Sequence, residues 1–300
     1  MKLLKSATIY LSFLISFVFS NSPYNHSLEF SLPIYRFSYS EELNKPSYGR
    51  DVWIFGQPRS DEYGSTAGGE IGYKYFDRNS KLSFGVKFNY SRSINHTYDG
   101  SLQGEVYVVY PVTDDNRISE EGYPAIIYEP VMIKDKNNYF YGADIEIGYL
   151  ISANYSRVIF EPKVTATING WMRPVGYTEY YYWSRICPGI SLTTQNSQKL
   201  GVFSDLSLSI PVWQEMILRW GSQKYKFDIG GKIGWQFEFG FLRYLQRNRT
   251  FKITYFYECY GFKQSGFVNI PALGGPALEP SSDTNNHGVK ISLEFGFGGE

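Results

Sequence analysis

Apolar side chains alternate with polar or small ones over unusually long stretches of this sequence. Between residues 225 and 241, Tyr, Phe, Ile and Trp occupy one set of alternate positions, and Lys, Asp, Gln, Glu and Gly dominate the other. The same alternation recurs in four further stretches, at residues 82–90, 139–149, 157–168 and 289–297. A period of two places successive side chains on opposite faces of an extended strand. The chain is therefore expected to be an all-β protein whose strands have one apolar and one polar face.

Composition narrows the class of protein. The 300 residues include 29 basic and 29 acidic side chains, and 18% of the residues are aromatic. Zero net charge argues against a nucleic-acid-binding protein, which normally carries a basic surplus. The aromatic content argues against a disordered chain. A mean hydropathy of −0.31, with one long apolar segment, argues against a bundle of membrane-spanning helices.

The N-terminus has the features of a secretory signal peptide. Lys2 and Lys5 precede an apolar segment at residues 7–19, and Val18 and Ser20 are compatible with cleavage before Asn21. We expect residues 1–20 to be removed on export and residues 21–300 to form one domain. No later segment approaches the ~20 apolar residues of a spanning helix.

The alternating segments and their connections predict a transmembrane antiparallel up-and-down β-barrel. We expect ten strands, near residues 27–40, 67–77, 81–92, 138–151, 156–169, 181–194, 199–212, 224–243, 250–262 and 287–297. Short polar turns are expected at 77–80, 152–155, 195–198 and 246–249, and longer loops at 41–66, 93–137, 170–180, 213–224 and 263–286. Short turns on one side and long loops on the other are typical of outer-membrane barrels. An extra hairpin at 106–112 and 125–133 would change the count, so 8–12 strands remain open.

Alternation alone does not separate a membrane barrel from a secreted β-sandwich or a lipocalin-like barrel. Several predicted strands exceed the ~9–11 residues that span lipid, whereas soluble strands commonly have about 5–6. Aromatic residues cluster at strand ends, as in Tyr180–Trp183 and Tyr255–Tyr257, where an interfacial girdle is expected. These features favour the membrane barrel over the soluble alternatives.

The whole pattern resembles bacterial outer-membrane β-barrels as a class. The last strand, Asn286–Phe297, looks like the C-terminal signal that the barrel-assembly machinery reads, although the chain continues with Gly298, Gly299 and Glu300. The resemblance implies a location in the cell outer membrane of a Gram-negative-type bacterium. It also implies contacts with outer-membrane lipid, and with the assembly machinery and periplasmic chaperones during biogenesis.

Ten strands with five long loops are similar to the omptin family of outer-membrane proteases. Omptins carry an acidic pair on the loop after the third strand and an Asp-x-His pair on the loop after the seventh. Here the first of these loops has only His96 and Asp99, and the second, Trp213–Trp220, has neither Asp nor His. No catalytic residue is carried over, and we expect a protein that is not an enzyme.

Other chemistry is sparse. No motif predicts a metal site or a cofactor, and none of the three His residues belongs to a catalytic pattern. Cys187 and Cys259 follow opposite strand faces, so we expect two free thiols rather than a disulfide.

The charged residues of the polar faces are the best candidates for a functional role. Eighteen of them, nine acidic and nine basic, share the inward parity. The foremost candidates are Lys87, Asp144, Glu146, Glu161, Lys163, Arg185, Asp228, Lys232 and Glu238. Charges in a narrow lumen must be paired or hydrated. They predict either an internal salt-bridge network or the lining of a small conduction path.

Three functions remain open from the sequence. The first is a non-enzymatic surface or interaction protein whose long loops, above all 41–66 and 93–137, contact an extracellular partner. The second is a narrow porin-like channel for ions or small solutes. The third is a surface hydrolase, which the missing catalytic residues disfavour.

Overall fold

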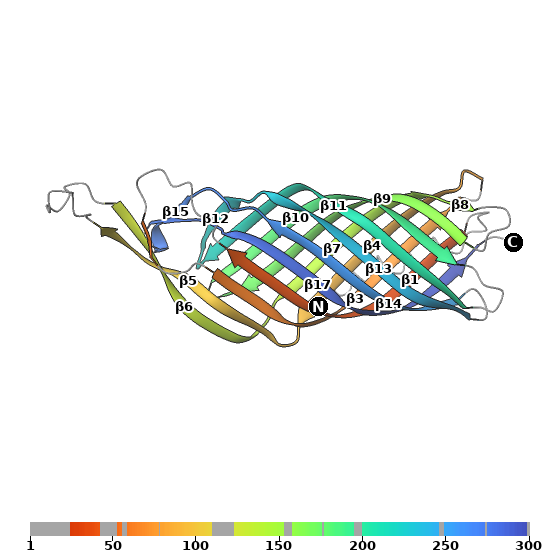
Figure 1. Cartoon of the computed structure of the whole chain (residues 1–300), viewed down its shortest axis with the longest axis horizontal. Helices are drawn as coiled ribbons and strands as arrows, with labels where there is room; N and C mark the ends of the chain where they lie inside the picture. Colours follow the sequence, from red (N-terminus) through yellow and green to blue (C-terminus); the bar gives the residue numbers. More distant parts are fainter. Residues whose placement is uncertain are drawn as a thin grey trace.

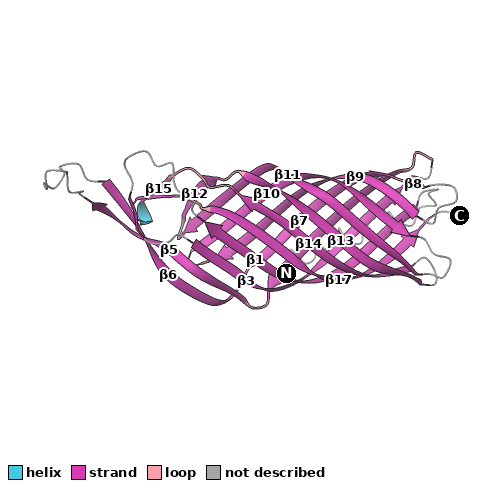
Figure 2. Ribbon diagram, viewed as in Figure 1, coloured by secondary structure: helices cyan, strands magenta, loops and turns pink. Residues whose placement is uncertain are grey.

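The computed structural model describes a chain that folds almost entirely as β-strands. The described residues are 25–42, 53–55, 59–77, 79–109, 123–152, 158–175, 177–194, 200–245, 249–273 and 275–298. Figure 2 shows strands throughout the body of the molecule, and the helical element among these residues is a short 3-10 turn, Pro271–Leu273. None of the described segments is a helix long and apolar enough to cross a membrane. The predicted all-β class is confirmed.

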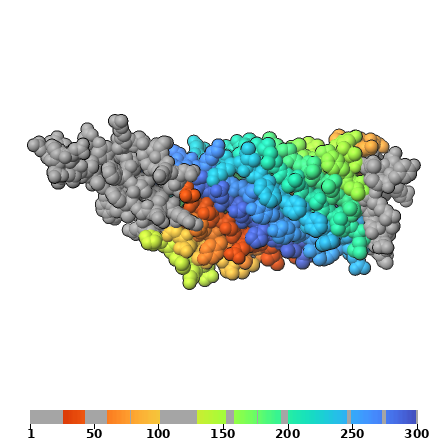
Figure 3. Space-filling model, in the orientation of Figure 1, coloured from red at the N-terminus to blue at the C-terminus, as the bar shows by residue number. Residues whose placement is uncertain are grey.

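Ten long antiparallel strands form a closed barrel. Each pairs with its neighbour along the chain, and β17 pairs with β1, which closes the sheet. Figure 3 shows β1 in red beside β17 in blue at the surface. The ten strands are β1 (Asn25–Glu42), β3 (Arg59–Phe76), β4 (Leu82–Ser93), β7 (Tyr139–Tyr149), β9 (Val158–Pro174), β10 (Thr178–Thr194), β11 (Leu200–Trp220), β13 (Gly231–Leu245), β14 (Arg249–Phe262) and β17 (Ser281–Phe297). All ten predicted strands are present, and the predicted up-and-down barrel is confirmed.

Two segments predicted as irregular loops are largely strand. Within 170–180, only three residues separate β9 from β10, and within 213–224 β11 turns directly into β12 (Gln223–Asp228). The inward side chains of these extensions, such as Trp171 and Met216, belong to a buried hydrophobic core. Apolar packing inside the barrel therefore continues the strands past the predicted loop boundaries.

The predicted strand 224–243 is interrupted. β12 ends at Asp228 and β13 begins at Gly231, while β12 pairs only with the extended end of β11. The barrel wall is thus continued by β13 alone, and β12 forms a hairpin with β11 at the long-loop end.

The extra hairpin allowed by the sequence exists but does not enter the wall. β5 (His96–Val109) and β6 (Tyr123–Lys136) pair with each other, and β5 joins the barrel only where Thr97–Asp99 pairs with Asp61–Tyr63 of β3. Figure 1 shows this hairpin extending beyond the barrel, where β2 (Trp53–Phe55) pairs with β6 in parallel. The barrel therefore keeps ten strands.

The opposite end of the barrel has short connections. Between β3 and β4, the backbone nitrogen of Asp77 donates to the carbonyl oxygen of Leu82 at 2.9 Å, and Ser80 Oγ donates to the Asp77 carboxylate at 2.6 Å. β8 (Ile151–Ser152) pairs with the start of β9 at this end. The predicted signal peptide 1–20 and most of the other three predicted turns lie outside the described residues.

A band of exposed apolar side chains surrounds the barrel. It contains Phe30, Leu32, Ile34, Phe84, Phe88, Ile145, Ile147, Val164, Ile168, Ile186, Ile190, Leu206, Leu208, Phe239, Phe241, Ile253, Val289 and Ile291. Polar side chains of the same strands point inward. This is the inverse of a soluble barrel and the arrangement expected of one surrounded by lipid.

Ile145 lies midway along the band on β7, and its side chain is 50% exposed. Ile145→Lys is expected to lower the free energy of unfolding in lipid vesicles by about 2–4 kcal/mol, because a cation at mid-membrane depth is poorly solvated. Met132→Lys, on β6 beyond the barrel and 56% exposed, is the matched control and should be nearly neutral. Urea titration in vesicles measures both, and equal effects would contradict the lipid-facing assignment.

Candidate functional site

The inward side chains surround a cavity of about 590 Å³ inside the barrel. Nine carboxylates line it: Glu29, Glu70, Asp144, Glu146, Glu161, Asp205, Glu238, Glu258 and Glu294. Six cations line it: Lys74, Lys87, Lys163, Arg185, Lys252 and Lys290. The lining therefore carries three more carboxylates than cations.

One half of the cavity is crossed by a connected chain of ion pairs. Lys163 Nζ contacts Glu146 at 2.8 Å and also pairs with Asp205. Lys74 Nζ bridges Glu146 at 3.2 Å and Glu161 at 2.6 Å. These residues come from β3, β7, β9 and β11, so the ion pairs join distant parts of the wall.

The other half is organised in the same way. Lys290 Nζ lies 2.9 Å from Glu238 and 3.5 Å from Glu70. Lys252 Nζ lies 2.7 Å from Glu29 and 2.7 Å from Glu294. Two simpler pairs complete the lining, Lys87 with Asp144 at 2.9 Å and Arg185 with Glu258 at 2.8 Å.

The structure places seven of the nine foremost candidates on this cavity. They are Lys87, Asp144, Glu146, Glu161, Lys163, Arg185 and Glu238. Asp228 is on β12, its carboxylate is 89% exposed, and it lies 3.6 Å from Lys226. Lys232 pairs with Asp283 at 2.9 Å and does not line the cavity. The inward assignment of Asp228 is corrected because β12 lies outside the wall, and that of Lys232 because the pairing of β13 with β14 shifts register between Lys232 and Trp235.

A layer of aromatic side chains closes the cavity toward the long-loop end. Its members are Phe37, Tyr39, Phe140, Trp171, Tyr181, Trp183, Tyr260 and Phe262. Trp171 is central, with its ring centroid 4.9 Å from those of Tyr39 and Tyr181 and 5.7 Å from that of Phe140. The predicted girdle Tyr180–Trp183 is therefore only half correct, because Tyr181 and Trp183 are buried inside the barrel.

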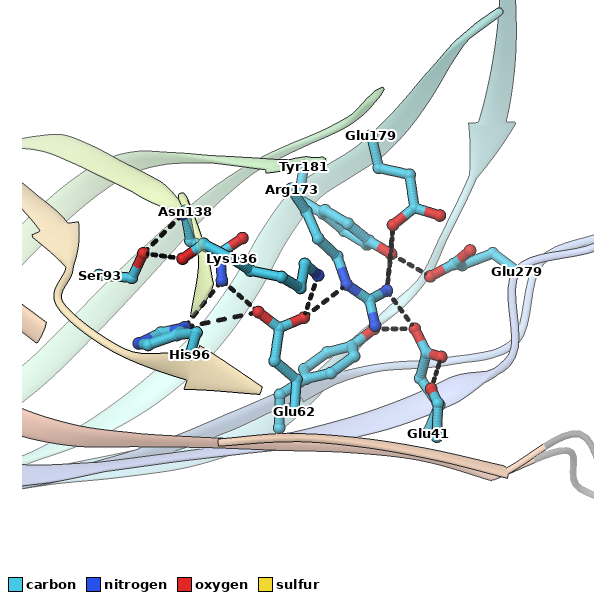
Figure 4. A network of polar contacts seen from close by, with 12 residues as sticks. Glu41, Glu62, Ser93, His96, Lys136, Asn138, Arg173, Glu179, Tyr181 and Glu279 are labelled. Atoms are coloured by element: carbon cyan, nitrogen blue, oxygen red, sulfur yellow. Dashed lines mark hydrogen bonds and ion pairs between the residues drawn. The ribbon is translucent and has the colours of Figure 1, made fainter. Parts of the chain in front are cut away.

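A buried ionic cluster lies against this layer, centred on Arg173 (Figure 4). The Arg173 Nη1 atom donates to Glu41 at 2.7 Å and to Glu179 at 3.0 Å, and Nε donates to Glu62 at 3.0 Å. The Tyr181 hydroxyl oxygen lies 3.2 Å from the Glu179 carboxylate and is also within hydrogen-bond distance of Glu279. Three carboxylates from different parts of the chain thus contact one guanidinium that is 2% exposed, and a fourth carboxyl group, Glu279, joins the cluster through Tyr181.

Glu62 connects Arg173 to a second set of polar groups. Lys136 Nζ donates to Glu62 at 2.8 Å, and the Asn138 amide donates to the same carboxylate. His96 Nδ1 lies 3.4 Å from Glu62 and 2.7 Å from the Asn138 amide nitrogen. His96 Nε2 lies 2.8 Å from the Thr66 hydroxyl, so both ring nitrogens have partners.

The His96–Asp99 combination noted in the sequence is not assembled. Asp99 lies on β5 opposite Asp61, and the acidic neighbour of His96 is Glu62. His96 is fully buried and stacks on Phe37 with ring centroids 5.0 Å apart. A histidine enclosed in this way orders the closure and has no solvent-facing side on which a substrate could bind.

The cluster contains more carboxyl groups than cations, and the pKa values of these carboxyl groups shift in different directions. Burial raises the pKa of Glu279 well above its ordinary value, and the neighbouring Glu41 and Glu179 carboxylates add to the rise. Burial likewise raises the pKa of Glu179, against the opposing charge of Arg173. For Glu62, the hydrogen bond with His96 and the charges of Arg173 and Lys136 outweigh burial and hold the pKa well below its ordinary value. The environment therefore favours the protonated form of Glu279 and the ionised form of Glu62.

Lys136 is the other group whose charge depends on this environment. Burial and the nearby Arg173 guanidinium lower the pKa of Lys136 to about 8, against the attraction of Glu62.

Among the described residues, no group of three or more His, Cys, Asp or Glu side chains has the arrangement of a metal site. Cys187 and Cys259 are free thiols, as predicted.

The sequence contained a partial signal for this cluster. Arg173 follows Trp171 by two residues, and Glu179 precedes Tyr181 by two, so all four continue the inward parity of β9 and β10. The predicted strands 156–169 and 181–194 stopped short of Trp171, Arg173 and Glu179, so this continuity was missed. The convergence of Glu41 and Glu62 on Arg173, and of Glu279 on Tyr181, depends on barrel closure and has no local sequence signature.

Replacement of Arg173 tests whether the cluster holds the closure together. Arg173→Met is expected to lower the free energy of unfolding by about 3–5 kcal/mol at neutral pH, because it leaves buried carboxylates without their cation. Arg219→Met, at an exposed arginine of β11, is the control and should change stability little. Urea unfolding of the two variants in detergent compares them, and a small effect at Arg173 would contradict this role.

Two isosteric variants test the opposite pKa shifts of Glu279 and Glu62 through the pH dependence of stability. Because the folded-state pKa of Glu279 is raised, its stabilising contribution is full below about pH 4.5 and is lost as pH rises through the folded-state value. Glu279→Gln should therefore gain stability relative to the wild type as pH rises. The contribution of Glu62 is present above about pH 4.5 and is lost as pH falls through its depressed folded-state pKa.

Glu62→Gln should accordingly lose the most stability near neutral pH and progressively less below about pH 4.5. Urea midpoints of both variants across this pH range give the comparison. If the stabilities of the two variants changed with pH in the same way, the opposite pKa shifts of Glu279 and Glu62 would be contradicted.

Comparisons with known proteins identify the fold. The sequence matches no protein-family profile and no curated protein. The outer-membrane protease OmpT from Escherichia coli superposes with a TM-score of 0.52 at 10% sequence identity, over 93% of this chain and 98% of that one. Neisserial surface protein A gives a TM-score of 0.30 at 8% identity over 91% and 97% of the two chains. The Pseudomonas putida toluene transporter TodX gives 0.31 at 6% identity over 93% and 91%.

The likeness to OmpT shows that this chain has the fold of an outer-membrane β-barrel. At 10% identity it shows the fold alone, and it carries no residue of one protein over to the other. The fold and the apolar band together indicate a location in an outer membrane.

Proposed function

We propose that this protein is a non-enzymatic, non-conducting surface barrel that presents its long-loop end to an extracellular partner. The observation that carries the proposal is the closure of the interior at that end. Trp171 and the other members of the aromatic layer fill the cross-section, and Arg173 ties together carboxylates that reach it from several strands. A barrel built in this way is a rigid support rather than an open pore.

The extended hairpin supports an interaction role. β5 and β6 project beyond the closure (Figure 1) and are joined to the wall through three residue pairs with β3. Projecting loops on a rigid scaffold are common positions for binding residues. In this proposal the signal peptide directs export, the barrel-assembly machinery and periplasmic chaperones guide insertion, and lipid contacts the apolar band.

Planar-bilayer recording tests the closure. The refolded wild-type protein, shown to be folded by heat-dependent gel mobility, is expected to give no unitary current steps. Phe140→Ala combined with Trp171→Ala removes two stacked rings of the layer and is expected to open a conducting path. Phe241→Ala, on the exposed apolar face, is the control for a lost aromatic side chain. Steps from the wild-type protein would overturn the non-conducting assignment.

A narrow channel is the second candidate, and the charged cavity is the observation that favours it. Its nine carboxylates and six cations leave a negative excess that attracts cations. If the wild-type barrel conducts, the current should be cation-selective, and reversal potentials in a salt gradient would show that selectivity.

A further inference from the structure

The β5–β6 hairpin is attached to the barrel over a short distance. Among the described residues, its backbone pairs with the wall at three positions, where Thr97–Asp99 lie opposite Asp61–Tyr63 of β3. β5 also contacts η1 (Pro271–Leu273) and β16 (Gly275–Ala277), which themselves lie outside the wall. Each wall strand, by contrast, pairs with neighbours on both of its sides. The hairpin can therefore separate from the barrel at a smaller cost than a wall strand.

Side chains at the base of the hairpin, where β5 begins and β6 ends, converge on Glu62 of β3. Lys136 Nζ donates to the Glu62 carboxylate at 2.8 Å, and the Asn138 amide donates to the same group. His96 Nδ1 lies 3.4 Å from this carboxylate. From the wall, Arg173 Nε donates to it at 3.0 Å, and Figure 4 shows Glu62 between Lys136 and Arg173. One carboxylate thus joins the hairpin to the closure.

Glu62 separates two buried cations. Lys136 belongs to the hairpin and is 4% exposed, and Arg173 belongs to the wall strand β9 and is 2% exposed. Lys136 Nζ and the central guanidinium carbon of Arg173 each lie 5.1 Å from the centroid of the Tyr98 ring, so both cations pack against the same side chain of β5. Without the Glu62 charge, a cation of the hairpin would face a cation of the wall in a buried site, where like charges repel strongly.

The other charged groups nearby do not replace Glu62. The charged and titratable groups around it are Lys136 of β6, His96 and Tyr98 of β5, and Arg173 of β9, with Glu41 of β1 and Glu179 of β10 in contact with Arg173. Within the described part of the chain, Glu62 is the one carboxylate within ion-pair distance of Lys136.

A second acidic pair at the attachment acts in the opposite direction. Asp61 of β3 and Asp99 of β5 lie directly opposite each other, and the Asp99 side chain is exposed. Like charges that face each other across two strands weaken the pairing. Protonation of these two carboxylates would therefore strengthen the attachment, so it cannot account for a release in acid.

We propose that the ionised Glu62 carboxylate holds the β5–β6 hairpin against the closure, and that protonation of Glu62 in acid releases the hairpin from a barrel that stays folded. Repulsion between Lys136 and Arg173 drives the release once the carboxylate is neutral. The inference rests on the surface role proposed above, because it assigns a control by pH to the hairpin that would meet the partner.

The direction of the pH dependence follows from the Glu62 carboxyl group. Burial would raise its pKa, but the hydrogen bond with His96 and the charges of Arg173 and Lys136 outweigh burial and hold the pKa well below its ordinary value of 4.5. The contribution of Glu62 to the attachment is therefore full above about pH 4.5 and is lost as pH falls through the depressed value. Between the two values, the ratio of attached to released hairpin should fall about tenfold for each pH unit. Lys136 stays a cation throughout this range and adds no pH dependence there.

The distance between two spin labels tests the release. In a background with Cys187→Ser and Cys259→Ser, the labels are attached through Met132→Cys on β6 and Ser222→Cys in the β11–β12 turn, both at exposed positions. Double electron–electron resonance in detergent should give one narrow distance distribution at pH 7, a broad one at pH 3, and the narrow one again on return to pH 7. Heat-dependent gel mobility checks that the barrel stays folded. A narrow distribution at pH 3 in a folded barrel would overturn the proposal.

Glu62→Gln removes the charge at nearly constant shape. It should give the broad distribution already at pH 7, with no further change at pH 3. Glu70→Gln is the matched control, because Glu70 is another carboxylate of β3 but contacts Lys290 inside the barrel. It should keep the narrow distribution at pH 7. Equal distributions in the two variants at pH 7 would contradict a specific role of Glu62.

A double variant tests the cause of the release. Glu62→Gln combined with Lys136→Met also removes the cation of the hairpin, and it should restore the narrow distribution at both pH 7 and pH 3. A broad distribution in the double variant would exclude repulsion as the cause and overturn the proposal. These measurements need neither a partner nor a bilayer. A conducting barrel or a missing partner would therefore contradict the proposed function without changing their outcome.

Discussion

A barrel with an apolar outer face must place its polar groups inside, and this constraint shapes the rest of the molecule. Lipid offers no hydrogen bonds, and nine carboxylates and six cations of the wall strands line the lumen. Each of the six cations on the cavity contacts at least one carboxylate there. The ion pairs join strands that are distant in sequence, so they make the barrel wall more rigid.

Local periodicity explains how much could be predicted. Strict alternation, as in Leu82–Tyr90, identified all ten wall strands and the inward position of most lining charges. It failed at Asp228, where β12 leaves the wall while its pattern continues. It also could not reveal the closure, because the contacts of Arg173 join residues up to 132 positions apart. Such contacts arise from register around a closed sheet, which short-range pattern does not encode.

The likeness to OmpT concerns the fold alone. Apolar side chains at alternate positions and pairing of the first strand with the last are enough to form the barrel. Many different sets of inward side chains are compatible with both. Here the long-loop end contains stacked rings and a buried guanidinium, and His96 is enclosed beside Glu62. In a scaffold of this kind, the long loops can change without changing the packing of the barrel interior.

The closure also sets an order of events during biogenesis. Arg173 needs Glu41 from the first strand, Glu62 from the second wall strand and Glu179 from the sixth, while Tyr181 reaches Glu279, just before the last strand. No fragment of the chain contains this set until synthesis of the barrel is nearly complete. In the proposed non-conducting barrel, the closure is consequently among the last features to form, once β17 has docked on β1.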